Sequence, residues 1–194
     1  MKYNRPKGTR DILPPESIKK YWVEEIFRKT VKRYGFVEIF TPIFEHTELF
    51  LRSTGESTDI VTKQMYTFSD QAQRSLTLRP EGTPGVVRAI IENGIKIPAR
   101  FFYVGPMYRY ERPQKGRYRE FYQLGIEVIG EASPELDAEV IEIGYRFFTA
   151  VGIKDCSIQI NSVGCPECRP KFRQELLNFL SDKKDKICDD CKIR

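Results

Sequence analysis

The sequence predicts an α+β fold, in which an antiparallel sheet is flanked by helices, and three observations support this prediction. Strand-like segments are joined in places by short loops, as in hairpins, which pair strands antiparallel. Segments with apolar residues at helical spacing lie mostly apart from those hairpins, which favours the α+β class. No internal repeat or low-complexity tract is present, so the pattern is that of a globular domain.

The first helix is predicted over residues 17–34, and Gly35 stops its pattern. Apolar side chains recur there at helical spacing, at Ile18, Trp22, Ile26 and Phe27. A strand is expected next over 36–44, "FVEIFTPIF", although Pro42 limits how it can pair. Residues 46–73 are mixed and polar, and they indicate a helix or a loop followed by a turn. A short strand in "SLTLRP" comes after them.

The segment "GTPGVVRAIIENG" predicts a helix with Thr83 as its N-cap, Pro84 in the first turn and Gly94 after its end. Its expected core face consists of Val87, Ile90 and Ile91. After a strand–loop–strand, another helix is expected, capped by Ser133 with Pro134 at its first position. "CSIQINSV" predicts a further strand. The last helix is expected to turn four side chains inward, at Phe172, Leu176, Leu177 and Leu180.

Composition limits the classes of protein to consider. The chain has 194 residues, of which 40% are hydrophobic and 30% charged, as in a globular protein rather than a disordered or fibrous one. The N-terminus has charges where a secretory signal needs an apolar core, and no apolar run approaches the ~20 residues of a membrane span. We therefore expect a soluble, cytoplasmic protein with no membrane partner.

Positive charge is concentrated in the loop between two of the predicted strands. Residues 109–119 contain five arginines or lysines and one acid, Glu111, an excess of +4, whereas the whole chain carries +5. A fold does not require its positive charge to be gathered on one hairpin. An anionic ligand is therefore expected to bind there.

The strand that follows this loop has two unlike faces, because alternate residues of a strand point to opposite sides. The apolar face carries Glu120, Tyr122, Leu124, Ile126 and Val128, and the mixed face carries Arg119, Phe121, Gln123, Gly125 and Glu127. On the strand before the loop, one face carries Tyr103, Gly105, Met107 and Arg109. The mixed face either meets water or forms a binding floor. Two glycines and a phenylalanine favour the floor, because glycine in a strand often marks the close approach of a ligand or another backbone.

A floor of this kind suits a nucleotide. Arg109 at the strand end and Arg117 in the loop are expected to hold two phosphates of one triphosphate, because a guanidinium makes paired hydrogen bonds to phosphate oxygens. Phe121 offers a flat surface for a base. The sequence has no glycine-rich phosphate loop, so arginines would do the holding.

Three further polar residues suggest a second ligand. Glu81, Gln123 and Glu127 would present two carboxylates and an amide to a small cationic molecule. Alternatively, Glu81 only complements the positive end of the helix that follows it. The spacing of these residues does not separate the two interpretations.

These residues lie in segments that resemble a known family. "TLRPEGTPGVVRA" and "YVGPMYRYERPQKGRYREFYQLGIEVIG" look like the core of the histidyl-tRNA synthetases, which are class II aminoacyl-tRNA synthetases. "KGTRDILPPE" and "TPIFEHTELF" are similar to the N-terminus and motif 1 of that family. The resemblance covers nearly all of the chain. It implies the class II catalytic fold, a homodimer interface built by motif 1 around Pro42, and a strand–loop–strand that serves as motif 2.

The resemblance also implies a role for each nucleotide-binding residue. Arg109 would be the catalytic residue, in contact with the α-phosphate of ATP and the carboxylate of histidine. Glu111 would lie at the adenine edge, Phe121 would stack on the adenine ring, and Arg117 would reach the γ-phosphate.

Under the same resemblance five residues would hold histidine: Arg109, at its carboxylate, and four others. Glu81, Thr83 and Gln123 would bind its amino group. Glu127 would accept a hydrogen bond from its imidazole.

The implied reaction forms histidyl-adenylate from histidine and ATP, with Mg²⁺, and passes the histidyl group to the 3′ end of tRNA(His). The histidine carboxylate is already ionised when it attacks the α-phosphorus in line, so this step needs no general base. Positioning and charge neutralisation would do most of the work. Arg112 and Gln114, on the motif 2 loop, would face the acceptor end of the tRNA.

The chain departs from the family pattern at its end. It stops at Arg194, before motif 3, a second histidine-binding segment and the anticodon-binding domain of the family. We expect residues 1–160 to form an incomplete catalytic core with motifs 1 and 2, and residues 161–194 to begin the helical segment that follows. Histidine activation by this chain alone is expected to be poor or absent.

Two other functions are compatible with parts of the pattern. The first is a regulatory paralogue of the synthetase that binds histidine and partners an ATP phosphoribosyltransferase, but such a regulator has no use for Arg112, Gln114 and Arg117. The second is an RNA-binding module built on the basic loop, which would not need Glu81 and Gln123 around a small pocket.

The cysteines follow a spacing typical of a structural zinc site. Two Cys-x₂-Cys pairs are separated by nineteen residues, and their members are Cys165, Cys168, Cys188 and Cys191. The alternative is four reduced cysteines on a peripheral helical hairpin, since the catalysis of the resembling family does not use zinc. Cys156 is expected on a strand, as a core residue.

Overall fold

The structure is a computed structural model that describes residues 3–54, 64–112, 114–161, 164–183 and 186–188. The chain divides into two compact units, Met1–Cys156 and Ser157–Arg194, which are described separately below. Among the described residues, no helix combines the length and the apolar character needed to cross a membrane.

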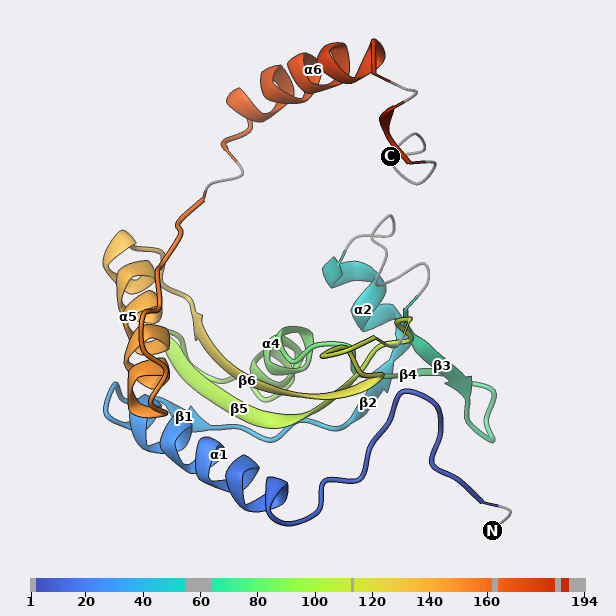
Figure 1. The fold of residues 1–194 in the computed structure, drawn as a ribbon, viewed down its shortest axis with the longest axis vertical. Coiled ribbons are helices and arrows are strands. Elements are labelled where there is room, and N and C mark those ends of the chain that lie inside the picture. The colour runs from blue at the N-terminus through green and yellow to red at the C-terminus, as the bar shows by residue number, and fades with distance from the viewer. Residues whose placement is uncertain (1–2, 55–63, 113, 162–163, 184–185, 189–194) are drawn as a thin grey trace. The chain divides into compact units, whose positions relative to one another are not determined.

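The larger sheet of the first unit is built on the predicted hairpin. Its strands, in spatial order, are β1 (Val37–Glu38), β5 (Ala99–Tyr108) and β6 (Glu120–Ile129). β5 and β6 pair antiparallel over their full length, with Tyr103 opposite Gly125, and β1 adds to β5 in parallel. In Figure 1 the β5–β6 hairpin is the long curved ribbon pair at the centre of this unit. The predicted strand–loop–strand is therefore confirmed.

A smaller antiparallel sheet consists of β2 (Phe44–His46), β4 (Ser75–Leu78) and β3 (Tyr66–Ser69), in that spatial order. β4 is the predicted short strand, whereas β3 lies in the stretch for which only a helix or loop and a turn were expected. In the same stretch α2 (Thr47–Thr54) is helical.

The prediction of one strand over 36–44 is wrong, because β1 and β2 belong to different sheets. Pro42 has no amide hydrogen to give to a neighbouring strand. The carbonyls of Thr41 and Pro42 instead accept hydrogen bonds from the Arg79 guanidinium, at 3.0 and 3.5 Å. The chain therefore leaves one sheet and enters the other at this point.

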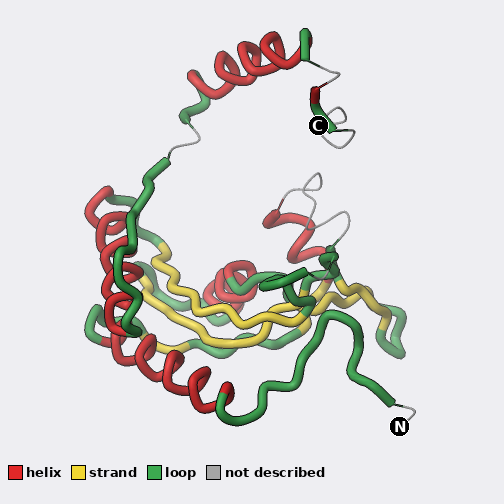
Figure 2. Tube along the Cα trace, in the orientation of Figure 1, coloured by secondary structure: helices red, strands yellow, loops and turns green. Residues whose placement is uncertain are grey.

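Helices cover the two faces of the β5–β6 hairpin (Figure 2). α1 (Glu16–Lys32) and α5 (Pro134–Ala150) pack on one face through a core of Phe27, Val31, Phe36, Phe102 and Ile143. α4 (Thr83–Glu92) packs on the other face through Val86, Ile90, Ala99, Tyr103 and Met107. Because Phe102 and Tyr103 are neighbours on one strand, their side chains enter opposite cores. The apolar face predicted for β6 contributes Leu124, Ile126 and Val128 to the first core, as expected.

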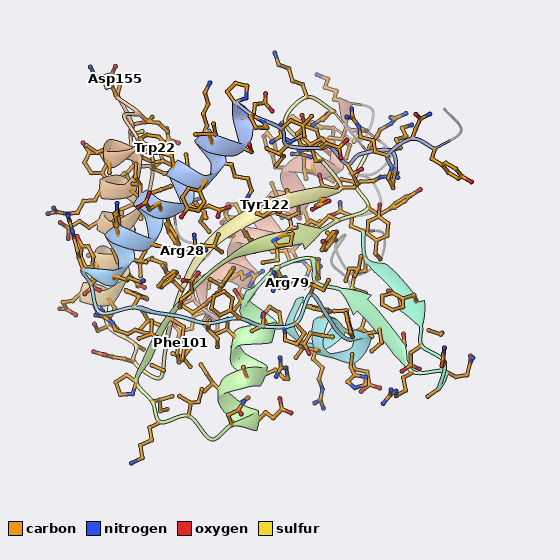
Figure 3. The ribbon with its side chains drawn as sticks, turned by 90° about the horizontal axis from the view of Figure 1, so that it is seen from below. Trp22, Arg28, Arg79, Phe101, Tyr122 and Asp155 are labelled. Carbon is orange, nitrogen blue, oxygen red and sulfur yellow. The ribbon has the colours of Figure 1, made fainter. Side chains whose placement is uncertain are left out.

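Two predicted helices have their expected extent but a different buried face. In α1 burial is concentrated at Phe27 and Val31, whereas Ile18 and Trp22 near its start remain exposed (Figure 3). In α4 the buried face is Pro84, Gly85, Val86 and Ile90 rather than Val87, Ile90 and Ile91.

The predicted caps also differ between helices. Gly82 occupies the N-cap of α4, so Thr83 is its first helical residue and not its cap. The Thr83 hydroxyl bonds to Glu127 instead. The cap predicted for α5 is confirmed, since the Ser133 hydroxyl accepts a hydrogen bond from the Leu136 amide at 3.3 Å.

The second unit contains α6 (Cys168–Ser181). None of its described side chains is buried, so the prediction that Phe172, Leu176, Leu177 and Leu180 point into a core is wrong within this unit. The predicted strand 156–163 is absent over 156–161, where no described strand pairs with it, and 162–163 lie outside the described residues. Cys156 is half-buried and not on a strand, which corrects its assignment as a core strand residue.

Candidate functional site

The loop before α4 is tied to strand β6 by two hydrogen bonds. The Gly82 amide donates to Oε1 of Gln123 at 3.2 Å, and the Thr83 hydroxyl donates to Oε1 of Glu127 at 2.6 Å. Gln123 and Glu127 point the same way, because they lie four residues apart on one strand. These bonds bring Thr83, Gln123 and Glu127 to one place, with Glu81 in the same loop. Four of the five residues that the resemblance assigns to histidine therefore form one cluster.

Tyr103 belongs to this cluster, although the sequence assigned it no role. It lies opposite Gly125 in the hairpin register. A Cβ atom added to Gly125 or to Gly82 would come within 2.2 Å of the Tyr103 ring. A large ring opposite a glycine on paired strands is the signal in the sequence that would have identified it.

The glycines of the predicted floor, Gly105 and Gly125, leave room for side chains of the protein itself and not, as was predicted, for a ligand. Gly125 and Gly105 were expected to mark the close approach of a ligand. Instead, the atoms nearest to a Cβ at these positions belong to the Tyr103 ring and to the Arg79 guanidinium, whose Nη2 would be 2.4 Å from a Cβ on Gly105. Internal side chains fill the space that the glycines leave.

The electrostatics of the cluster centre on Glu127. Burial raises the pKa of its carboxyl above the ordinary value, the hydroxyls of Thr83 and Tyr103 oppose that rise by donating hydrogen bonds, and the charge of Glu81 adds to it. Burial, together with the charge of Glu127, also raises the pKa of Tyr103 to about 12. The phenol is therefore neutral and available as a hydrogen-bond donor at neutral pH.

This raised pKa predicts a pH dependence that Glu127→Gln should remove. The folded chain holds the Glu127 proton more tightly than the unfolded chain, so its folding stability falls as pH rises from the ordinary value of 4.5 through the folded pKa. A neutral glutamine has no such penalty. In urea unfolding, we expect the variant to gain stability over the unaltered chain as pH rises above about 4.5. A difference in the free energy of unfolding between the two chains that stays constant as pH rises would contradict the raised pKa of Glu127.

Arg109 begins the loop between the hairpin strands, next to the cluster. Its Nε donates to the Pro80 carbonyl at 2.9 Å, and its Cζ lies 5.1 Å from the centroid of the Phe121 ring. This contact is within the range of a cation–π interaction. The arginine and the aromatic ring that were predicted to hold a phosphate and a base are thus neighbours on the same face of the hairpin.

The loop itself is exposed and largely held by its own residues. Glu111 forms an ion pair with Arg117 at 3.7 Å. Gln114 and Arg117 close a turn through two backbone hydrogen bonds, with Gly116 between them at φ +82°. Arg112 and Gln114 are exposed.

Arg79 is a second residue that the sequence did not single out. Arg79, labelled in Figure 3, is 8% exposed, and its guanidinium donates to the carbonyls of Pro106 and Thr41 at 2.9 and 3.0 Å. Burial lowers its pKa, but a guanidinium stays charged in proteins. Its contacts join the 41–42 segment, the loop that carries Glu81, and strand β5.

The cysteines give no support to a metal site in the described part of the chain. The Cys165 amide donates to Sγ of Cys168 at 2.9 Å, and hydrogen bonds from the backbone, chiefly from Cys168, lower the pKa of the Cys165 thiol. Cys188 is exposed, and Cys191 lies outside the described residues. No cluster of three potential ligands occurs among the residues that the structure describes. The four-thiolate zinc site stays a prediction.

Comparison with known proteins identifies related sequences and folds. Residues 8–181 match the family model described as histidyl-tRNA synthetase. The histidine–tRNA ligases of Halothermothrix orenii and Thermosipho africanus are 52% and 53% identical over 100% and 99% of this chain. The chain spans 47% of the length of each of these two relatives.

Solved structures agree with the sequence matches. The apo histidyl-tRNA synthetase of S. aureus has a TM-score of 0.73 and 37% identity, with 99% of this chain and 46% of that chain covered. A Bacillus halodurans structure, described as an ATP phosphoribosyltransferase regulatory subunit/histidyl-tRNA synthetase, has a TM-score of 0.69 and 27% identity, with 80% and 40% covered. The chain is therefore similar, in both sequence and fold, to less than half of the length of each of these proteins.

Proposed function

This chain belongs to the histidyl-tRNA synthetase family, and from that premise we propose that it supplies the ATP-binding floor and part of the histidine pocket of a histidine–tRNA ligase. The observation that carries the proposal is a pair of adjacent groups on the β5–β6 hairpin. One is Arg109 beside Phe121. The other is the Glu81–Thr83 loop bonded to Gln123 and Glu127.

On the nucleotide side, Arg109 would neutralise the α-phosphate while Phe121 stacks on the adenine. Glu111 would meet the adenine edge, and Arg117 would bind the γ-phosphate. ATP enters as its magnesium complex, so that the metal and the arginines share the negative charge of the phosphates. Because that charge moves onto pyrophosphate in the transition state, fixed cations accelerate the step.

On the amino-acid side, a cationic amino group suits the two carboxylates and the amide of the cluster. Glu81, Thr83 and Gln123 would hold the amino group of histidine, and Glu127 would accept a hydrogen bond from the imidazole. Tyr103 and Thr83 donate to Glu127, which fixes the carboxylate in position. The carboxylate of histidine is then directed toward the phosphorus that Arg109 holds.

We assign the unit Met1–Cys156 to the catalytic core with motifs 1 and 2. Its partners would be tRNA(His), through Arg112 and Gln114 on the exposed loop, and a second copy of the chain. The segment around motif 1 supports the homodimer, because four apolar side chains in it or just before it remain exposed in one copy, at Val37, Phe40, Ile43 and Phe44.

One set of assays separates this function from the two alternatives. In the full-length parent, histidine-dependent ATP–pyrophosphate exchange requires a synthetase. Histidine binding without exchange would indicate the regulatory paralogue, and affinity for RNA alone would indicate an RNA-binding module. The relatives at 52% and 53% identity carry the ligase name, which favours the synthetase over the regulator.

In that parent, Glu127→Ala is expected to weaken the binding of histidine more than the binding of ATP. The carboxylate contacts Thr83 and Tyr103 on the amino-acid side, and in the described part of the chain none of the groups that shift its pKa is an arginine. The KM for histidine in the exchange assay should rise by about tenfold or more, as for a lost charged hydrogen bond. The KM for ATP should change far less. Equal losses for both ligands would contradict the assignment of Glu127 to the imidazole.

A further inference from the structure

The N-terminal segment and the hairpin loop form a groove, and none of the roles above uses its N-terminal wall. The groove has a volume of about 380 Å³, and its walls come from residues 5–9 and from Gln114, Arg117 and Tyr118. Three lining residues are cations, namely Arg5, Lys7 and Arg117, and no lining residue is acidic. Such a groove attracts an anion.

The N-terminal wall is seated on the base of the loop by specific contacts. The Arg119 amide donates to the Gly8 carbonyl at 2.7 Å, and Nη1 of Arg119 donates to the Lys7 carbonyl at 3.4 Å. Gly8 has φ +88°, and a Cβ there would lie 2.7 Å from the Arg119 side chain. The Arg10 guanidinium stacks over the Tyr118 ring at 4.7 Å. The position of this wall is therefore set by the loop.

We propose that Arg5 and Lys7 form the second wall of a phosphate-binding groove that receives the sugar–phosphate backbone of the RNA end docked on the loop. This inference rests on the proposed function, because it extends the RNA contact assigned to Gln114. RNA fits better than a free nucleotide for two reasons. The cations are spread along an open groove, as suits a chain of phosphates. The Gln114 amide in the same groove is neutral and can bind a base edge of the RNA, whereas the base of ATP is assigned to Phe121 and Glu111, which do not line this groove.

The test replaces both N-terminal cations, Arg5→Ala with Lys7→Ala, in the full-length parent. We expect the KM for a tRNA(His) transcript in aminoacylation to rise about tenfold, because two phosphate contacts are lost. The dependence of RNA affinity on salt should weaken by about two in log–log slope. Histidine-dependent ATP–pyrophosphate exchange should change by less than about twofold, because neither residue meets the amino acid or ATP.

The matched control replaces one lysine and one arginine elsewhere, Lys32→Ala with Arg33→Ala, which are exposed at the end of α1. This variant loses the same charge and should keep both the transcript KM and the salt slope. If the control variant weakens RNA binding as much as the test variant does, the effect is one of net charge and the groove is not an RNA-binding site. Gly8→Ala offers a second probe, because it displaces the wall without removing a charge, and it should raise the transcript KM in the same direction.

Two results would overturn the inference. One is an unchanged transcript affinity in the Arg5/Lys7 variant, measured by direct binding so that the result does not depend on catalysis. The other is a raised KM for ATP in the exchange assay, which would assign the groove to the nucleotide. By contrast, a parent without any histidine-dependent exchange would contradict the proposed function, while the binding comparison would still decide for or against the groove.

Discussion

Arg109→Ala should abolish adenylate formation in the full-length parent while leaving the fold intact. The residue lies where the nucleotide side and the amino-acid side meet, next to Phe121 and bonded to Pro80. Its guanidinium would meet both reacting groups, the histidine carboxylate and the α-phosphate. Removing a fixed cation from a developing phosphate charge costs about 10³-fold or more in rate. Histidine-dependent ATP–pyrophosphate exchange measures this step directly.

The change should cost little stability, because Arg109 contributes one hydrogen bond to a backbone carbonyl and is only partly buried. Circular dichroism and the unfolding midpoint should therefore stay close to those of the parent. Lys115→Ala is the matched control, since it removes an exposed cation from the same loop and should leave exchange unchanged. Arg109→Lys keeps the charge but not the fork of donors, so partial activity is expected. Exchange within a few-fold of the parent for Arg109→Ala would refute its catalytic assignment.

The hairpin could be predicted from the sequence because its signals are local. Alternation of Leu124, Ile126 and Val128 against polar neighbours sets one face, and the paired strands confirm that face as a core. The clustering of Glu81 with Gln123 was one of two interpretations that the residues left open, and the resemblance favoured it, since the two residues are far apart in the chain. In the structure, the amide of Gly82, the residue after Glu81, donates a hydrogen bond to the side chain of Gln123.

Other features could not be predicted because they depend on contacts distant in sequence. Glycines at 105 and 125 were interpreted as room for a ligand, whereas Arg79 and Tyr103 occupy that room. The hairpin register could have indicated Tyr103 opposite Gly125, but no local pattern indicates that Arg79 lies over Gly105. The break between β1 and β2 has the same origin, since the carbonyl of Thr41 bonds to Arg79 rather than to a strand. Helical spacing likewise predicts that a helix forms but not which element it packs against. The apolar residues of α6 lie at helical spacing, yet none of its described side chains is buried.

Arg79→Met is expected to be the most destabilising of these changes. The Arg79 guanidinium is buried and its hydrogen bonds end on backbone carbonyls of Thr41, Pro42 and Pro106, with a further one to the Thr41 hydroxyl. Methionine fills much of the volume but leaves those acceptors without a donor. Breaking a buried network of this kind should lower the free energy of unfolding by about 4 kcal/mol, measured in urea. Arg74→Met, at an exposed ion pair with Asp70, should shift the midpoint far less.

The position of the Arg79 guanidinium over Gly105 can also be tested, by a substitution of that glycine. Gly105→Ala should destabilise the chain, because the added methyl group would collide with Nη2 of Arg79. Arg79→Lys shortens the head group and leaves room for that methyl. The double variant should therefore lose less stability than the two single losses added together. If the stability losses of the two single variants add up to that of the double variant, the guanidinium does not lie over Gly105. For Arg79→Met, an unchanged unfolding midpoint would mean that the carbonyl partners of Arg79 find other donors.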